Sequence, residues 1–266
     1  VKLMGAVRAV FFDIDGTLVS FRTHRVPQSA LDAVAALRRR GVKVYIATGR
    51  PLPFIDNLGD LEYDGMVTVT GAHCFARDGK VIFQRSVSDH SVERVVAHLM
   101  CGEDAYPVIF VCADEMFVTD INDDVAEVAR LLDIRMPPVR PASHALGKEV
   151  LQLISFFDAE RESRLMSELM PDCTPMRWHP LFVDVIAGGV DKSVGIDRVL
   201  AYEGISLDEV MAFGDGGNDM AMLTHVPYGV AMGNACDELK AVARYVTASV
   251  DDDGVEKALR HFGLID

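Results

Sequence analysis

Two carboxylates stand two residues apart at the end of an apolar run near the N-terminus. The run over residues 9–12 predicts a buried strand, and Gly16 marks its end. Because side chains alternate faces along a strand, Asp13 and Asp15 are expected to project together. Adjacent carboxylates repel each other unless a cation or a proton lies between them. The pair predicts a metal-assisted site, although a solvated turn or a helix cap uses the same residue types.

Three further polar segments are expected at the same edge of one sheet. Thr48-Gly49-Arg50 and the run Gly214-Asp215-Gly216-Gly217-Asn218-Asp219 each follow a predicted strand, and Lys192 opens a predicted helix. In an open parallel sheet, ligands bind at the carboxyl ends of the strands. Taken singly, these segments could be a strand exit, a helix cap and a surface lysine. Their joint occurrence with Asp13 and Asp15 favours an enzyme.

Strands and helices alternate at both ends of the chain, and the middle follows another pattern. Before residue 85 and after residue 187 the order predicts βαβ units and a parallel sheet. Between them, paired strands alternate with helices, which predicts an antiparallel sheet with helices on one face. We therefore expect an α/β fold with a Rossmann-like parallel-sheet core (1–84 and 188–266) and an inserted α+β module (85–187).

Composition restricts the partners of this chain of 266 residues. The net charge is −14 and the pI is near 4.9, which disfavours nucleic acid and anionic membranes as partners. The five cysteines are scattered without metal-ligand spacing, and reduced thiols in a cytoplasmic protein explain them most simply. No apolar run approaches the roughly 18 residues of a membrane helix. We expect a cytoplasmic monomer or small homo-oligomer that binds a small molecule.

The four polar segments together resemble the haloacid dehalogenase superfamily of phosphohydrolases. Asp13-x-Asp15-Gly16-Thr17 is similar to its first motif, Thr48 to its second, Lys192 to its third, and the run from Gly214 to Asp219 to its fourth. A module inserted after the third predicted strand resembles the type II caps. Its strand-rich order resembles the IIB, or Cof-type, sugar-phosphate phosphatases. The resemblance covers essentially the whole chain.

The resemblance implies a Mg²⁺-dependent phosphatase that forms an aspartyl-phosphate. Asp13 would be the nucleophile, and Asp15 the general acid and base. Mg²⁺ suits ligands that are all oxygen. The implied ligands are the Asp13 and Asp215 carboxylates and the Asp15 backbone carbonyl. Asp219 is implied to lie just outside these direct ligands of the metal. The residues implied to bind phosphate are Thr48, Gly49, Lys192 and Asn218.

The identity of the residues that contact the rest of the substrate is open at this point. Arg50 is expected to contact substrate or to form a local salt bridge. The other possible substrate contacts are Gly71, Ala72, Arg177, Trp178 and His179. The favoured substrate is a small phosphorylated metabolite, most simply a hexose phosphate. Two alternatives are a phosphosugar mutase of the same superfamily and a metabolite-binding regulator without catalysis.

Overall fold

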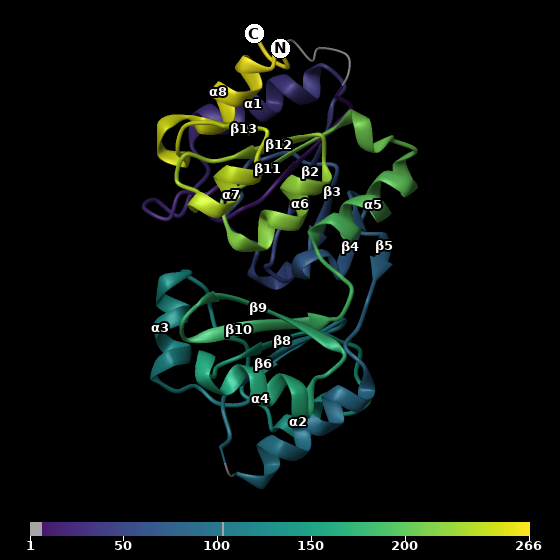
Figure 1. Cartoon of the computed structure of the whole chain (residues 1–266), viewed down its shortest axis with the longest axis vertical. Coiled ribbons are helices and arrows are strands. Elements are labelled where there is room, and N and C mark those ends of the chain that lie inside the picture. The colour runs from purple at the N-terminus through teal and green to yellow at the C-terminus, as the bar shows by residue number, and fades with distance from the viewer. Residues whose placement is uncertain (1–6, 103) are drawn as a thin grey trace. The chain divides into compact units, whose positions relative to one another are not determined.

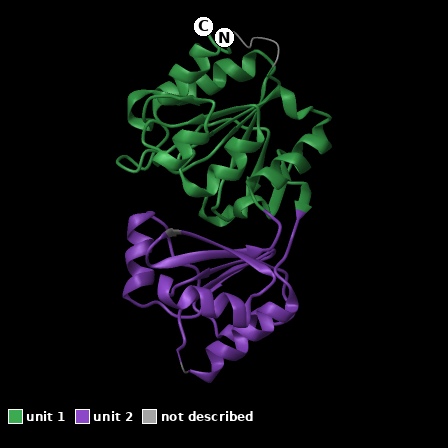
Figure 2. Cartoon of the chain, viewed as in Figure 1, with its two compact units in different colours: residues 1–83, 191–266 green, residues 84–190 purple. Residues whose placement is uncertain are grey.

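The chain divides into two compact units. The structure is a computed structural model that describes residues 7–102 and 104–266, except for the side chain of Trp178. Unit 1 comprises Val1–Phe83 and Asp191–Asp266, and unit 2 comprises Gln84–Val190, as coloured in Figure 2. The insertion therefore interrupts unit 1 only once, and each unit has a sheet of its own.

Unit 1 is built on a sheet whose strand order is β13-β12-β11-β1-β2-β3-β4-β5 (Figure 1). Its strands are β1 (Ala9–Phe12), β2 (Lys43–Ala47), β3 (Gly65–Thr68), β4 (His73–Ala76), β5 (Val81–Gln84), β11 (Val210–Gly214), β12 (Tyr228–Ala231) and β13 (Tyr245–Val246). The strands from β13 to β3 run parallel, and β4 pairs antiparallel with β3. Phe12 pairs with both Ile46 and Phe213, so β1, β2 and β11 end level with one another. The residues that follow these strands therefore meet at one edge.

Helices cover both faces of this sheet, as the two-sided burial of parallel strands requires. One apolar cluster joins Val10 and Phe12 of β1 to α1 (Gln28–Arg39) and α8 (Gly254–His261). The other joins Ala9 and Phe11 to α5 (Lys192–Glu203), α6 (Met220–His225) and α7 (Asp237–Val242). Every side chain of β1 is buried, which explains why its sequence is an unbroken apolar run.

The structure departs from the predicted elements in a few places. The sequence over 65–70 predicts a third strand, but β3 ends at Thr68, because Val69 and Thr70 have positive φ angles of 51° and 48°. Pro51 predicts the start of a short helix, and the structure has one turn of 3-10 helix there, Leu52–Phe54. The pattern did not predict α7 or β13, since both are too short to show a clear period.

Unit 2 is an antiparallel sheet with the strand order β7-β6-β8-β10-β9. The strands are β6 (Val108–Cys112), β7 (Met116–Val118), β8 (Val150–Ser155), β9 (Cys173–His179) and β10 (Phe182–Ala187). The helices are α2 (Asp89–Cys101), α3 (Asp123–Leu131) and α4 (Ala159–Leu169). Apolar side chains of α2 and α4 share one cluster with β6, β8 and β10, so these helices lie on one face of the sheet. The predicted combination of a parallel-sheet core and an α+β insertion is confirmed.

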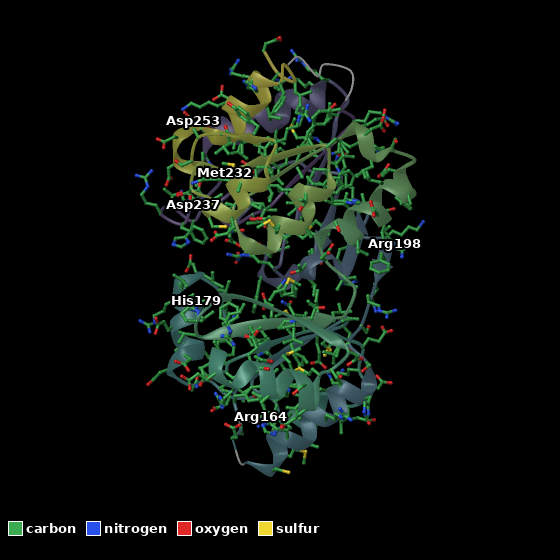
Figure 3. The ribbon with its side chains drawn as sticks, in the orientation of Figure 1. Arg164, His179, Arg198, Met232, Asp237 and Asp253 are labelled. Carbon is green, nitrogen blue, oxygen red and sulfur yellow. The ribbon has the colours of Figure 1, made fainter. Side chains whose placement is uncertain are left out.

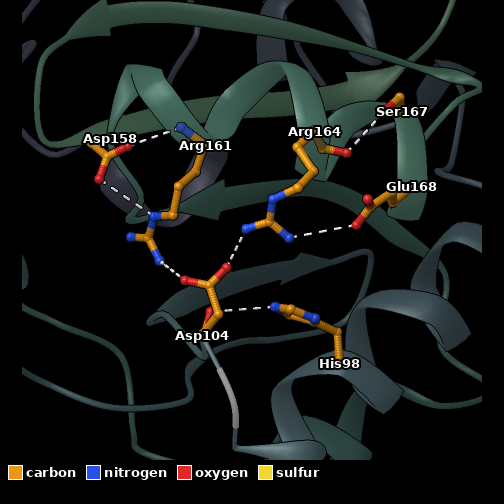
Figure 4. A network of polar contacts seen from close by, with 7 residues as sticks. All are labelled: His98, Asp104, Asp158, Arg161, Arg164, Ser167 and Glu168. Atoms are coloured by element: carbon orange, nitrogen blue, oxygen red, sulfur yellow. Dashed lines mark hydrogen bonds and ion pairs between the residues drawn. The ribbon is translucent and has the colours of Figure 1, made fainter.

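A surface network of charged groups links the loop after α2 to α4 (Figure 4). Asp104 accepts a hydrogen bond from Arg161 Nη1 at 2.8 Å and also pairs with Arg164. Asp158 caps α4 by accepting from the Arg161 amide at 2.9 Å. The two guanidinium groups lower the pKa of Asp104 through these hydrogen bonds. The network therefore ties the α2–β6 loop to the start of α4.

None of the helices among the described residues is long and apolar enough to span a membrane.

Candidate active site

Lys192 lies between two carboxylates in the interior of unit 1. Its Nζ donates to Asp13 Oδ1 and to Asp219 Oδ1, each at 2.6 Å. The exposed fractions of the three side chains are 0% for Lys192, 0% for Asp219 and 7% for Asp13. Burial alone would lower the pKa of Lys192, but the two carboxylates outweigh it and raise that pKa above its usual value. The ammonium group is therefore held in its charged form.

Lys192 is held in this position by a close backbone contact between the start of α5 and the β3–β4 turn. Asp191 caps α5, its side chain accepting from the Ser193 and Val194 amides, so Lys192 is the first residue of the helix. Gly71 has a φ of +99°, and a Cβ there would stand 1.9 Å from the Asp191 carbonyl oxygen. Only glycine combines that backbone angle with that contact. The predicted site residue Gly71, with Ala72 buried beside it, thus packs the β3–β4 turn against the start of α5.

Both carboxylate oxygens of Asp219 are already engaged. Oδ1 pairs with Lys192, and Oδ2 accepts from the backbone amides of Asp215 and Gly216 at 2.9 and 3.0 Å. Asp219 consequently fixes the loop after β11 and the lysine at the same time.

Asp215 faces Asp13 across the end of the sheet. Its Oδ1 accepts from the Thr17 hydroxyl at 3.3 Å, and its Oδ2 from the Asn234 amide at 3.2 Å. Ligand oxygens of Asp13, Asp215 and Asp219 all lie within 4.8 Å of one another. This arrangement of oxygen donors matches the preference of Mg²⁺, which binds through one or two carboxylates and keeps several waters.

The electrostatics of these acids also fit a cation. Burial raises the pKa of Asp13 well above its usual value, Lys192 partly offsets this, and the charges of Asp219 and Asp215 raise it further. Burial, followed by the charge of Asp219, raises the pKa of Asp215 to about 7. A cation at the carboxylates would remove this penalty, because it stabilises their ionised forms.

Three backbone amides in the segments that follow β1 and β2 have no internal acceptor among the described residues. The backbone amides of Ile14, Asp15 and Gly49 donate to no acceptor within the described part of the chain. Backbone amides are normally paired, so these three are available to an acceptor bound at this edge of the sheet. Thr48 Oγ1 accepts from the Arg50 amide at 3.1 Å, which leaves its hydroxyl hydrogen for another acceptor.

Asn218 and Gly49 bring the second and fourth motifs together. The Asn218 Nδ2 atom lies 3.3 Å from the point where a Cβ on Gly49 would stand. The Thr70 hydroxyl lies at the same distance from that point. A phosphoryl group above Gly49 would thus meet amide and hydroxyl donors.

Arg50 forms the local salt bridge that was one of its two expected roles. Its Nε donates to Asp15 Oδ2 at 2.6 Å and its Nη2 to Asp15 Oδ1 at 2.7 Å. Nη1 donates to the Phe54 carbonyl at 2.8 Å, which fixes the plane of the guanidinium. The Asp15 carboxylate is therefore held by a two-point contact, and substrate contact by Arg50 stays a prediction.

The possible substrate residues of unit 2 lie at the end of β9. The Arg177 guanidinium donates to Glu162 Oε2 at 2.6 Å and to the Phe157, Pro180 and Phe182 carbonyls. These contacts hold the β9–β10 turn against the start of α4. His179, labelled in Figure 3, accepts from the Leu181 amide at 3.3 Å and stacks on Phe182. The Trp178 side chain lies outside the described part of the chain, and substrate contact by this trio stays a prediction.

Comparison with known proteins agrees with this geometry. The family model of haloacid dehalogenase-like hydrolases matches residues 10–259. YkrA of Bacillus subtilis (strain 168), named as a candidate phosphatase, is 33% identical over 97% of this chain and 98% of its own. The structure of BT4131, described as a sugar phosphatase of subclass IIB, is 42% identical with a TM-score of 0.90, over 97% of this chain and 100% of its own. The phosphatase BT1666 of Bacteroides thetaiotaomicron is 36% identical with a TM-score of 0.89, over 100% and 98%.

The chain belongs to the haloacid dehalogenase-like hydrolases. It is an enzyme of the phosphatase type within that superfamily, and its neighbours confirm the Cof-type, subclass IIB assignment.

Sequence reasoning missed two residues that contact Asp215. The sequence predicts Thr17 only as part of the first motif, and no motif contains Asn234. Both follow a strand of the parallel sheet, β1 and β12 respectively, so position at the sheet edge was a signal for each. Loops after parallel strands can supply polar residues to a site even where no motif contains them.

Proposed function

We propose that this protein is a Mg²⁺-dependent phosphatase that hydrolyses small phosphorylated metabolites, most simply sugar phosphates, through an aspartyl-phosphate on Asp13. The observation that carries the proposal is the buried Asp13–Lys192–Asp219 cluster, to which the segments after β1 and β2 add three backbone amides without an acceptor among the described residues. The description of BT4131 as a sugar phosphatase supports the choice of substrate class.

Asp13 is the nucleophile in this proposal. Its Oδ1 pairs with Lys192, while its Oδ2 accepts no hydrogen bond from the described residues. The carboxylate attacks phosphorus, and the bond from phosphorus to the leaving oxygen breaks. Lys192 and the amides of Ile14, Asp15 and Gly49 stabilise the negative charge on the other phosphoryl oxygens, with Thr48 and Asn218 as further donors.

Asp15 moves the proton in both half-reactions. It protonates the leaving oxygen in the first, and in the second it takes a proton from the water that attacks the aspartyl-phosphate. Phosphate then leaves, and the Asp13 carboxylate is regenerated. Each Asp15 oxygen accepts one hydrogen bond from Arg50 and keeps a second lone pair that can carry the transferred proton.

The Asp13 and Asp215 carboxylates and the Asp15 carbonyl would hold Mg²⁺, and Asp219 would support them through Lys192 and the β11 loop. When bound, Mg²⁺ supplies positive charge that lets a carboxylate approach a phosphate dianion.

A panel of phosphorylated metabolites tests the proposal, with released phosphate and kcat/KM as readouts. Hexose phosphates are expected to rank among the best substrates, with activity lost in chelator and restored by Mg²⁺. Asp13→Asn should remove at least about 10³-fold of kcat, because a carboxamide is a poor nucleophile. Asp197→Asn is the matched control, since this exposed acid pairs only with His225 among the described residues.

The same panel separates the alternatives. An isomerised sugar phosphate without free phosphate would support a mutase, and binding without turnover would support a regulator. Full activity of Asp13→Asn would overturn the nucleophile assignment.

A further inference from the structure

One asparagine outside the recognised motifs bridges three segments at the edge of the unit 1 sheet. Asn234 Nδ2 donates to the Gly16 carbonyl at 2.8 Å and to Asp215 Oδ2 at 3.2 Å. Its Oδ1 accepts from the Val250 amide at 2.9 Å. Both ends of the amide are therefore used, and its orientation is determined by the partners.

The backbone around Asn234 is held in place by its own contacts. The segment starts at Met232, labelled in Figure 3, whose amide donates to the Gly214 carbonyl at 3.0 Å. The Gly233 amide donates to the Ala248 carbonyl at 2.9 Å, and a Cβ on Gly233 would stand 2.6 Å from the Ser249 nitrogen. This close approach brings the segment against the loop before α8. Asn234 is thus presented from a fixed turn.

The contacts of Asp215 differ in kind from those of Asp13 and Asp219. Lys192 forms ion pairs with the latter two, whereas the side-chain donors to Asp215 among the described residues, Thr17 and Asn234, are neutral. Neutral donors fix the direction of a carboxylate without cancelling its charge. The rotation of Asp215 is therefore restricted without an ion pair that would compete with a cation.

Asn234 also connects Asp215 to the loop that carries Asp15. The Gly16 carbonyl, which accepts from the same Nδ2, directly follows Asp15 in the chain. A single NH₂ group thus sets the relative positions of two segments that carry proposed metal ligands.

We propose that Asn234 is a positioning residue of the metal site, which orients Asp215 and the Asp15–Gly16 segment and thereby sets the affinity for Mg²⁺. The proposal rests on the proposed function through the assignment of Asp215 as a metal ligand. It predicts that Asn234→Ala weakens Mg²⁺ binding about tenfold, the lower end of the effect of removing an outer partner of a metal ligand.

The test is calorimetric titration of the full chain with MgCl₂, without substrate, together with thermal melting in chelator. Asp251→Ala is the matched control. Asp251 lies in the loop before α8, which also contains Val250. It accepts hydrogen bonds from Ser20 Oγ at 2.7 Å and from Arg22, but it has no hydrogen bond with Asp215. We expect Asn234→Ala to lose Mg²⁺ affinity with little change of melting temperature in chelator, and Asp251→Ala to keep the affinity of the parent protein.

Unchanged Mg²⁺ affinity in Asn234→Ala would overturn the inference while leaving the metal site of the proposed function intact. Equal weakening in Asp251→Ala would also overturn it, because the loop and not the amide would then control binding. Failure of the parent protein to bind Mg²⁺ would instead reject the metal assignment itself. If Asn234→Ala does not fold, Asn234→Ser gives the same comparison, since its shorter side chain withdraws the amide donor.

Discussion

Each unit contains a network of acids and bases, and the two networks differ mainly in burial. In unit 1, Lys192 is fully buried between Asp13 and Asp219. In unit 2, Arg161 and Arg164 pair with Asp104, and the exposed fractions of these side chains lie between 29% and 46%. A buried charge cannot lose its partner without a large desolvation penalty, whereas water and salt replace the partner of an exposed one. Pairs of acids and bases therefore form a buried cluster at the proposed site in unit 1 and an exposed contact between a loop and a helix in unit 2.

The largest effect is expected from Lys192→Met. Two buried carboxylates would lose their counter-charge, and we expect the free energy of unfolding of the metal-free protein to fall by about 3–5 kcal/mol. Urea denaturation in chelator measures this. Lys257→Met, at an exposed position of α8, should cost less than about 1 kcal/mol. Similar losses for both variants would contradict the contrast in burial.

The Arg50–Asp15 pair is intermediate in burial, since the Arg50 side chain is 10% exposed and that of Asp15 is 25% exposed. Arg50→Met removes the two-point contact that orients Asp15, so kcat should fall about ten- to a hundredfold, or about 1.4–2.7 kcal/mol. Steady-state kinetics at saturating substrate measure it. Arg50→Lys should recover only part of kcat, because an ammonium lacks the planar fork. A change confined to KM would argue for the substrate contact that was the other predicted role.

The affinity for Mg²⁺ should depend on pH, because burial and neighbouring acids in unit 1 raise the pKa of Asp215. The pKa of Asp215 is raised to about 7, so below pH 7 the metal-free protein binds a proton there that Mg²⁺ must displace. Affinity should therefore fall as pH decreases from 8 to 6, by up to about tenfold per pH unit below 7, or about 1.4 kcal/mol. Calorimetry in buffers of different ionisation enthalpy counts the released protons. A flat profile without proton release would contradict the raised pKa.

The smallest effect is expected from Arg164→Met. This side chain is 46% exposed, and exposed pairs contribute at most about 1 kcal/mol. The loss of unfolding free energy should shrink further in 0.5 M salt, where screening weakens surface pairs. The Lys192→Met loss should hardly respond to salt. A large, salt-independent loss for Arg164→Met would remove the distinction between the two networks.

Much of the fold followed from local pattern, but the end of β3 did not. The apolar run over 9–12 predicts β1, and the periodic pattern from about Pro27 to Arg40 predicts a helix that the structure places at Gln28–Arg39, because residue type encodes their burial. The end of β3 at Thr68 was missed, because Val69 and Thr70 have positive φ angles that their residue types do not favour. The roles of Asp13, Asp15, Lys192 and Asp215 remain predictions that the geometry makes testable.

Local sequence specifies which chemical groups stand at the carboxyl ends of strands, because strand period, loop position and residue type are local properties. The acids, the lysine and the order of the motifs could therefore be predicted. How these groups pair became known from the folded chain. Lys192 bridges Asp13 and Asp219, Arg50 holds Asp15, and Asn234 reaches Asp215. Such pairing depends on strand order and on close backbone contacts between distant segments. Neither can be predicted from local sequence.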